Sequence, residues 1–255
     1  MNSSTKTAQS FARASDTYDN YAEVQTTVGN RLIKKIPDIK PSHIVDFGCG
    51  TGKSTQALAN RFPEALITAT DINQSMVSCA KKKHPAPNIT YSVADIAELS
   101  LTGKESLIFS NAALQWVPNL EKVFTTIAST KSPQSVLAVS LFGPQTFHQL
   151  KMCLEIVFKT PILLPANSFH DALYIQNIAQ KHFKSVALDQ EIITVQFPTI
   201  KSLFESIKYT GTRGNGIQLN KSWTRRDFTN LEQCFLENYV GVQISYQLFY
   251  LIIKD

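Results

Sequence analysis

The segment HIVDFGCGTGKST, residues 43–55, carries the residues of this chain best suited to holding a small ligand. Its ending GKST suggests a phosphate-binding loop, but the pattern G-x-x-x-x-G-K-S/T needs a glycine where the chain has Phe47. The dinucleotide pattern G-x-G-x-x-G, begun at Gly48, fails because its last glycine is replaced by Lys53. Both phosphate-binding patterns therefore miss by one position.

The pattern that is present is D-x-G-x-G-x-G, made by Asp46, Gly48, Gly50 and Gly52. Glycines at a strand-to-helix turn allow positive φ and a close approach of a ligand to the backbone. A carboxylate at the mouth of this loop repels a polyphosphate and attracts a cation. S-adenosylmethionine (SAM) carries an ammonium and a sulfonium and has no phosphate, so the loop favours SAM as its ligand.

Two more aspartates are expected at the ends of the next strands. Asp71 follows Gly52 by about 20 residues, where an acid that accepts both ribose hydroxyls of a nucleoside belongs. Asp95 is predicted to accept from the adenine amino group, while Ile72 and Ile96 cover the two faces of the ring. A single aspartate at such a position is usually a helix cap. Three at successive strand ends, behind this loop, indicate a nucleoside site.

The elements that must position these residues alternate along the chain. Short apolar runs predict strands, and apolar residues spaced three or four apart predict helices between them. The strands are expected at 43–47, 66–71, 89–93, 106–110 and 135–142, and the helices at 53–62, 74–84 and 119–130. This alternation predicts right-handed βαβ units and a doubly wound, Rossmann-like α/β sheet covered on both faces.

After residue 143 the rhythm changes to helices near 146–158, 171–183, 199–210 and 224–239, with strands at 186–197 and 244–254. No Gly/Ser-rich linker separates this half. We therefore expect one domain, 1–255, in which the late helices form a cap. Its parts are expected to be lid helices in 1–30, a SAM-binding core in 40–142, an acceptor-binding cap with strand six in 143–240, and a final strand in 241–255.

Composition narrows the classes of partner. The 25 Lys and Arg against 20 Asp and Glu leave a net charge of +5, too mild to indicate a nucleic-acid surface. The four cysteines lack the CxxC spacing of a zinc site, and free thiols fit the cytoplasm. No signal peptide and no apolar run of about 20 residues is visible. We expect a cytoplasmic protein, without metal, that acts away from membranes.

Residues 40–142 resemble the class I SAM-dependent methyltransferases. The segment S-N-A-A-L-Q-W at 110–116 is similar to the carboxylate methyltransferases, both those that act on malonyl-acyl-carrier protein in biotin synthesis and those that act on trans-aconitate. Features outside the core favour the malonyl family. The opening motif of that family, F-x-x-A-x-x-x-Y-x-x-x-A-x-x-Q, is matched by Phe11, Ala14, Tyr18, Ala22 and Gln25. Its later motif, L-x-x-x-K-x-x-G, is matched by Leu203 or Phe204, Lys208 and Gly211. The segments 140–150 and 245–255 are also similar, whereas 132–135 replaces the family's Lys-Pro-Gly-Gly turn.

The resemblance implies a seven-stranded sheet whose last strand is antiparallel, and SAM as cofactor. It implies transfer of methyl to the free carboxylate of malonyl-acyl-carrier protein or malonyl-coenzyme A, giving the ester that primes pimelate assembly. The alternatives are a methyltransferase of the trans-aconitate type, a SAM-binding regulatory protein and an RNA methyltransferase. A monomer or weak dimer is expected. The cofactor residues are Asp46, Gly48, Cys49, Gly50, Gly52, Asp71, Ile72, Asp95, Ile96 and Asn111.

Such a reaction needs alignment rather than a general base, because a carboxylate with a pKa of about 4 is already an anion at neutral pH. The catalytic candidates are Tyr18, Tyr21 and Asn111. The two tyrosines share one helix face, which can close over SAM as a lid or serve as an ordinary packing stripe. Trp116 is expected in the core.

The acceptor side requires cations. The substrate-binding candidates are Gln25, Gln115, Lys208 and Arg213, the last two to fix the malonyl carboxylate. The candidates for docking an acidic carrier protein are Lys221, Arg225 and Arg226, and the run Lys81 to Lys83. Charge runs are more often solvated surfaces, and that alternative stays open.

Overall fold

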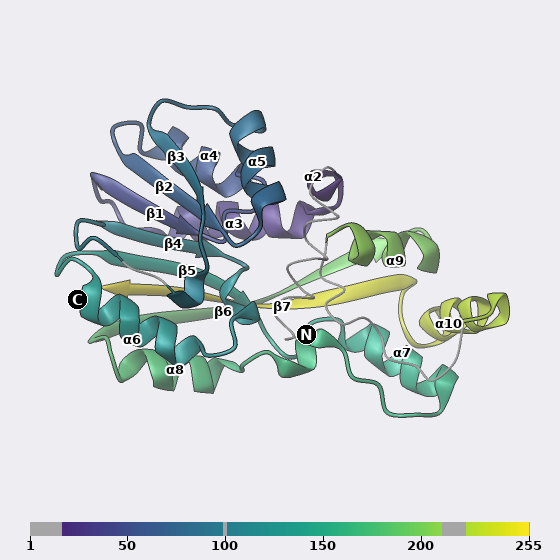
Figure 1. The fold of residues 1–255 in the computed structure, drawn as a ribbon. Helices are drawn as coiled ribbons and strands as arrows, with labels where there is room; N and C mark the ends of the chain where they lie inside the picture. The colour runs from purple at the N-terminus through teal and green to yellow at the C-terminus, as the bar shows by residue number, and fades with distance from the viewer. Residues whose placement is uncertain (1–16, 99–100, 211–222, 255) are drawn as a thin grey trace.

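The computed structural model describes residues 17–98, 101–210 and 223–254. Its centre is a seven-stranded sheet in the order β3-β2-β1-β4-β5-β7-β6 (Figure 1). The pairs among β1 to β5 are parallel, and β7 pairs antiparallel with both β5 and β6. The strands are His43–Phe47 (β1), Leu66–Asp71 (β2), Ile89–Val93 (β3), Leu107–Asn111 (β4), Val136–Phe142 (β5), Ser185–Phe197 (β6) and Val242–Lys254 (β7). The doubly wound sheet with an antiparallel last strand is confirmed.

Helices cover both faces of this sheet. They are Tyr18–Tyr21 (α2), Glu23–Lys35 (α3), Lys53–Arg61 (α4), Gln74–Lys83 (α5), Leu120–Thr130 (α6), His148–Phe158 (α7), Ala172–Gln180 (α8), Ile200–Tyr209 (α9) and Arg225–Asn238 (α10). Short 3-10 turns lie at Ile96–Glu98 (η1), Leu114–Trp116 (η2) and Pro165–Ser168 (η3). No helix in the described part of the chain has the length and apolarity to cross a membrane.

The residue alternation of the strands divides the core into two main layers. Ile44 packs with buried residues of α3 and α4, whereas its neighbour Val45 packs with residues of α6 and α8. Strand β5 is buried along its whole length, as expected for a strand covered on both faces. This core fixes the direction in which β1, β2 and β4 point.

The segment after β5 does two things. Helix α8 packs beside α6 and against β6, so it covers the sheet, while α7, α9 and α10 lie at the opposite end of the molecule from α6 (Figure 1). Helix α7 packs on α10, and α9 contacts α2. The N-terminal α2 therefore meets the late helices beside the edge where the parallel strands end.

Candidate active site

The glycine loop between β1 and α4 turns through left-handed backbone. Gly48 has φ 72°, and a Cβ there would lie 2.3 Å from the Cβ of Ala113, so the loop packs directly on the turn after β4. Gly50 has φ 55°, and a Cβ there would meet no atom within 4 Å. Only glycine satisfies the first position. The second leaves open space in which a ligand can approach the backbone.

Asp71, at the end of β2, fastens this loop. Its Oδ2 accepts from the Gly50 N–H at 3.0 Å and its Oδ1 accepts from the Asn73 N–H at 2.9 Å. Burial raises the pKa of Asp71, and the two backbone hydrogen bonds oppose that rise. Asp95 accepts from the Ala97 N–H at 2.8 Å. Each carboxylate keeps lone pairs for a ligand that donates hydrogen bonds.

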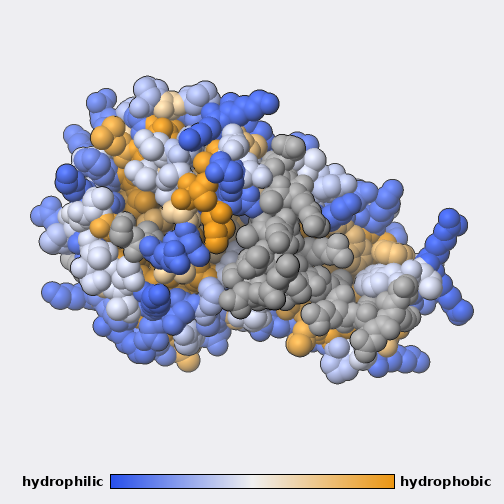
Figure 2. Space-filling model, in the orientation of Figure 1, coloured by the Kyte–Doolittle hydropathy of each residue, from blue (hydrophilic) through white to orange (hydrophobic). Residues whose placement is uncertain are grey.

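The outer pocket lies between these two acids. Its apolar walls come from loops that follow three different strands, so residues far apart in sequence enclose one space. On the face shown in Figure 2, hydrophobic residues form a patch below α5 within a mostly hydrophilic surface. Its lining includes Gly50, Asp71, Ile72, Met76, Asp95, Ile96 and Trp116. Carboxylates on a hydrophobic cleft suit a nucleoside, which combines hydroxyls with a flat ring.

Asp46 lies beneath the loop rather than at its mouth. It is 1% exposed because it faces inward from β1. Its Oδ2 accepts from Thr55 Oγ1 at 2.6 Å, and its Oδ1 has no hydrogen-bond partner among the described residues. The pKa of Asp46 is raised to about 7, mainly because the carboxyl is buried. The hydrogen bond from Thr55 lowers the pKa, and the negative charge of Asp71 raises it further. The expected position is corrected, but an unpaired acceptor still favours a cation.

Asp46 faces a second, inner pocket. Tyr18, Gly50 and Asn111 line both this pocket and the outer one, so the two are adjacent. The other walls are polar and come mainly from α3 and the loop. They include Gln25, Thr26, Cys49, Thr51, Lys53 and Ser54. An acid and a lysine in one small pocket suit an amino-acid group, which has both charges.

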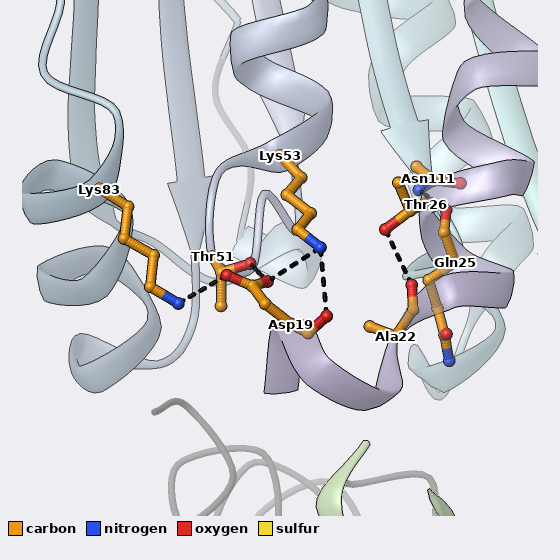
Figure 3. Close-up of polar contacts among 8 residues, drawn as sticks. All are labelled: Asp19, Ala22, Gln25, Thr26, Thr51, Lys53, Lys83 and Asn111. Carbon is orange, nitrogen blue, oxygen red and sulfur yellow. Dashed lines mark hydrogen bonds and ion pairs between the residues drawn. The ribbon is translucent and has the colours of Figure 1, made fainter. Parts of the chain in front are cut away.

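Asn111 ties together the elements around the inner pocket (Figure 3). Its Nδ2 donates to the Gln25 backbone carbonyl at 2.9 Å and to Ser54 Oγ at 3.2 Å. Its Oδ1 accepts from Ser140 Oγ at 2.7 Å. Gly29 allows the close approach of α3, since a Cβ there would lie 2.6 Å from Ser54 Oγ. The Asn111 amide thus has partners on α3, α4 and β5.

The two candidate lid tyrosines lie in different places. Tyr18 lines both pockets, and burial, together with the nearby carboxylates of Asp71 and Asp19, raises the pKa of its hydroxyl. Tyr21 instead stacks on Tyr209 of α9, with ring centroids 4.9 Å apart and planes inclined by 26°. Helix α2 therefore presents one ring to the pockets and the other to the late helices.

Gln115, predicted to bind substrate, lies outside both pockets, while Trp116 packs against the core as expected and also lines the outer pocket. The Nε2 of Gln115 donates 2.7 Å to the carbonyl of Ala112, a left-handed residue at φ 52°. Trp116 meets Phe169 edge-on at 5.0 Å. The pocket position of Trp116 could not be predicted from local sequence, because a tryptophan beside apolar residues fits a core equally well.

The remaining candidates lie away from the pockets or outside the described residues. Gly52 is the N-cap of α4, and a Cβ there would lie 3.1 Å from the Cβ of Ala80, so glycine allows α4 to begin close to α5. Lys208 is exposed on α9, with its Nζ 4.9 Å from the Tyr209 ring centroid. The candidates Arg225 and Arg226 are exposed at the start of α10, as are Lys81 to Lys83 at the end of α5. The candidates Arg213 and Lys221 fall outside the described residues.

Sequence missed one group altogether, the residues that hold α2. Asp19 accepts from Thr51 Oγ1 at 2.6 Å and from Lys83 Nζ at 2.5 Å. These residues come from three separate segments, and no spacing rule connects them. Met76 in the outer pocket was missed for the same reason.

Comparison with known proteins agrees with this geometry. Residues 44–134 match a family model described as a methyltransferase domain. The YcgJ protein of Bacillus subtilis aligns over 89% of this chain and 98% of its own, with a TM-score of 0.62 at 11% identity. A Haemonchus contortus phosphoethanolamine N-methyltransferase 2 aligns with a TM-score of 0.57 at 15% identity, covering 89% of this chain. This chain spans about half of that nematode protein, 52%. At these identities the two structures show the fold alone.

The sheet order and the glycine loop are those of the class I, SAM-dependent methyltransferases, and the family model identifies residues 44–134 as a methyltransferase domain. Over nearly its whole length the chain is similar to malonyl-acyl-carrier-protein O-methyltransferases. One from Ilyobacter polytropus is 28% identical over 96% of this chain and 92% of its own length. Another, from Priestia megaterium, is 29% identical over 92% of each chain.

Proposed function

We propose that this protein transfers a methyl group from SAM to the free carboxylate of malonyl-acyl-carrier protein, giving the methyl ester that primes pimelate assembly for biotin. The observation that carries the proposal is the full-length similarity to enzymes named for this reaction, at 28% and 29% identity. A methyltransferase domain alone would leave the acceptor open. The similarity extends past it into the cap, where the acceptor is expected.

The pockets fit SAM by their chemistry. We propose that Asp71 and Asp95 accept from the nucleoside in the outer pocket, with Ile72 and Ile96 against the ring. In the inner pocket the unpaired Oδ1 of Asp46 suits the ammonium of the methionine group. These groups together place negative charge where the ligand is positive. No cradle of backbone N–H groups for a polyphosphate is required.

SAM supplies an electrophilic methyl group, which an acceptor carboxylate takes without a general base. The protein's own residues therefore have to exclude water and align the acceptor. Tyr18 is suited to this, because it lines both pockets and the raised pKa keeps its hydroxyl neutral. Asn111 contributes by holding α3, through Gln25, at the edge of the inner pocket.

On the acceptor side we propose that Lys208 and Arg213 fix the malonyl carboxylate, and that Gln25 contacts the acceptor from the inner pocket. For Gln115 an indirect role is proposed, through the Ala112 turn. The acidic carrier is proposed to dock either on Lys221 with the exposed Arg225 and Arg226, or on the exposed run Lys81 to Lys83. The reaction is placed in the cytoplasm, where the four free thiols stay reduced.

The test is methyl transfer from radiolabelled SAM to a panel of acceptors. Malonyl-acyl-carrier protein, malonyl-coenzyme A, free malonate and trans-aconitate are compared at equal concentration. We expect label on the malonyl thioesters, released by mild base as methanol, and none above background on the free acids. Faster labelling of trans-aconitate would overturn the proposed acceptor while leaving the methyltransferase class intact.

A further inference from the structure

Asp19 lines neither pocket, and its carboxylate lies at the centre of a polar network (Figure 3). Its Oδ1 accepts from Thr51 Oγ1 at 2.6 Å, and its Oδ2 accepts from Lys83 Nζ at 2.5 Å. Lys53 Nζ donates to the Asp19 backbone carbonyl at 3.2 Å and lies 3.9 Å from Oδ1. One acidic residue therefore receives three donors.

The three residues that donate hydrogen bonds to Asp19 belong to different elements around the glycine loop. Thr51 lies in the glycine loop, Lys53 is the first residue of α4, and Lys83 is the last residue of α5. Asp19 lies on α2, next to Tyr18, which lines both pockets. The network thus joins α2, which carries Tyr18, to the glycine loop.

Helix α2 is short. It has four residues, of which Tyr18 is partly enclosed between the two pockets, and its N-cap Thr17 makes no side-chain capping hydrogen bond. A helix this short does not persist on its own, because nucleation costs more than a few hydrogen bonds return. Its place depends on tertiary contacts, and these include the Asp19 network and the stacking of Tyr21 on Tyr209.

The network is partly shielded from solvent, which makes it stronger than a surface ion pair. The Asp19 side chain is 17% exposed and that of Lys83 is 34% exposed. Burial opposes the ionisation of Asp19, but the hydrogen bonds from Lys83 and Thr51 and the charge of Lys53 outweigh it, and the pKa of Asp19 is lowered. Charge-assisted hydrogen bonds of this kind are about twice as strong as neutral ones.

Building on the proposed function, we propose that Asp19 is a positioning residue that latches α2 onto the glycine loop and so sets Tyr18 as the common wall of the two pockets. The Asp19 latch acts on SAM through Tyr18 and the loop, without touching the ligand. Its loss should weaken SAM binding and free α2 while leaving the sheet intact.

The test is a double-mutant cycle of Asp19→Asn and Lys83→Met, read by SAM calorimetry and by amide hydrogen exchange of residues 17–22. We expect each single variant to bind SAM about tenfold more weakly, which is about 1.4 kcal/mol, and to exchange faster over 17–22. The double variant should lose little more than Asp19→Asn alone, because both remove the same contact. Asp19→Glu, which keeps the charge, should recover part of the affinity.

The matched control is Asp189→Asn. Asp189 pairs with Lys35 at 2.6 Å in the same way, but it lies on β6 away from both SAM pockets, so SAM affinity and exchange over 17–22 should not change. Additive losses in the cycle, or unchanged exchange in Asp19→Asn, would overturn the latch. If the unmodified protein binds no SAM, the proposed function fails, and hydrogen exchange still decides whether Asp19 holds α2.

Discussion

The part of the chain up to β5, which we propose binds the methyl donor, and the segment after it, which we propose binds the acceptor, are built differently. In the first part, called the donor half, Asp46 lies in β1, Asp71 ends β2 and Asp95 follows β3, so the order of the parallel strands brings the three acids together. In the later segment, contacts join distant parts of the chain, as where the rings of Trp223 and Phe158 lie 5.1 Å apart. The donor half thus depends on local sequence, and the later segment on long-range packing.

Their charges differ in the same way. The donor half turns carboxylates inward, where burial raises the pKa values of Asp46 and Asp71. The late helices present exposed cations, Lys208, Arg225 and Arg226, to solvent. In the proposed function, a positively charged cofactor and a negatively charged acceptor each meet the opposite sign in this arrangement.

The largest effect is expected from the backbone of the donor half. Gly48→Ala should lower the free energy of unfolding by about 3 kcal/mol, because the new Cβ would overlap Ala113 and the residue would stay at positive φ. Gly50→Ala, with open space around it, should lower it by about 1 kcal/mol. Denaturant unfolding of both variants checks this, and equal losses would contradict the tight loop packing.

Removing the carboxylate at the end of β2 should be almost as severe for binding. Asp71→Ala is expected to weaken SAM binding about 100-fold, or about 2.7 kcal/mol, because it removes the ribose acceptor and releases the Gly50 N–H. Calorimetry measures the affinity, and a thermal melt separates it from unfolding. A loss below threefold in a folded variant would show that the acid edge does not bind the donor.

Asp46 should make SAM binding depend on pH. With its pKa raised to about 7, it is largely protonated below neutrality, so affinity should rise as the pH passes through about 7 and then level off. Asp46→Asn should bind about tenfold more weakly above pH 7 and lose this dependence. Calorimetry across pH 5.5 to 8.5, roughly centred on that pKa, reads both, and an unchanged slope in the variant would exclude Asp46 as its source.

The same raised pKa affects stability with a definite sign. Stability due to neutral Asp46 is fully present below the unfolded pKa of about 3.9 and is lost as the pH rises through about 7. The unmodified protein without SAM should therefore become less stable over that range than Asp46→Asn does. Melting temperatures of the two proteins across this pH range measure the difference. The same dependence of melting temperature on pH in both proteins would contradict a raised pKa for Asp46.

The smallest effect is expected on the acceptor side. Reversing Arg225 and Arg226 to Glu should raise KM for malonyl-acyl-carrier protein about fivefold, about 1 kcal/mol, because exposed charges steer a partner weakly at physiological salt. KM for a small malonyl thioester should stay the same. Lys104→Glu with Lys122→Glu changes net charge equally from exposed positions elsewhere. Equal effects on both substrates would remove α10 as the docking surface.

Sequence predicted the donor half closely because its signals are local. The expected strands 43–47, 66–71 and 89–93 match β1, β2 and β3, and Ile72 and Ile96, which are predicted to cover the adenine ring, both line the outer pocket. The burial of Asp46 was not predictable, because the motif D-x-G-x-G-x-G is compatible with a carboxylate at the mouth of the loop or beneath it. Only the packing of β1 decides between them.

After residue 143, the positions of the helices could be predicted from the sequence, but their packing partners could not. The helices near 171–183 and 199–210 are present, yet nothing in their periodicity says that Ala172–Gln180 covers the sheet while Ile200–Tyr209 meets α2. The Asp19 latch has the same origin, since its partners lie more than 30 residues away in sequence. Contacts of this kind follow from topology, which local patterns do not contain.

An acid-lined site without a phosphate cradle should select a cationic nucleoside. The decisive experiment is calorimetry of the unmodified protein with SAM and with ATP, in the same buffer near neutral pH. We expect saturable binding of one SAM per chain and no detectable heat from ATP. Tight binding of ATP together with no binding of SAM would contradict this selectivity.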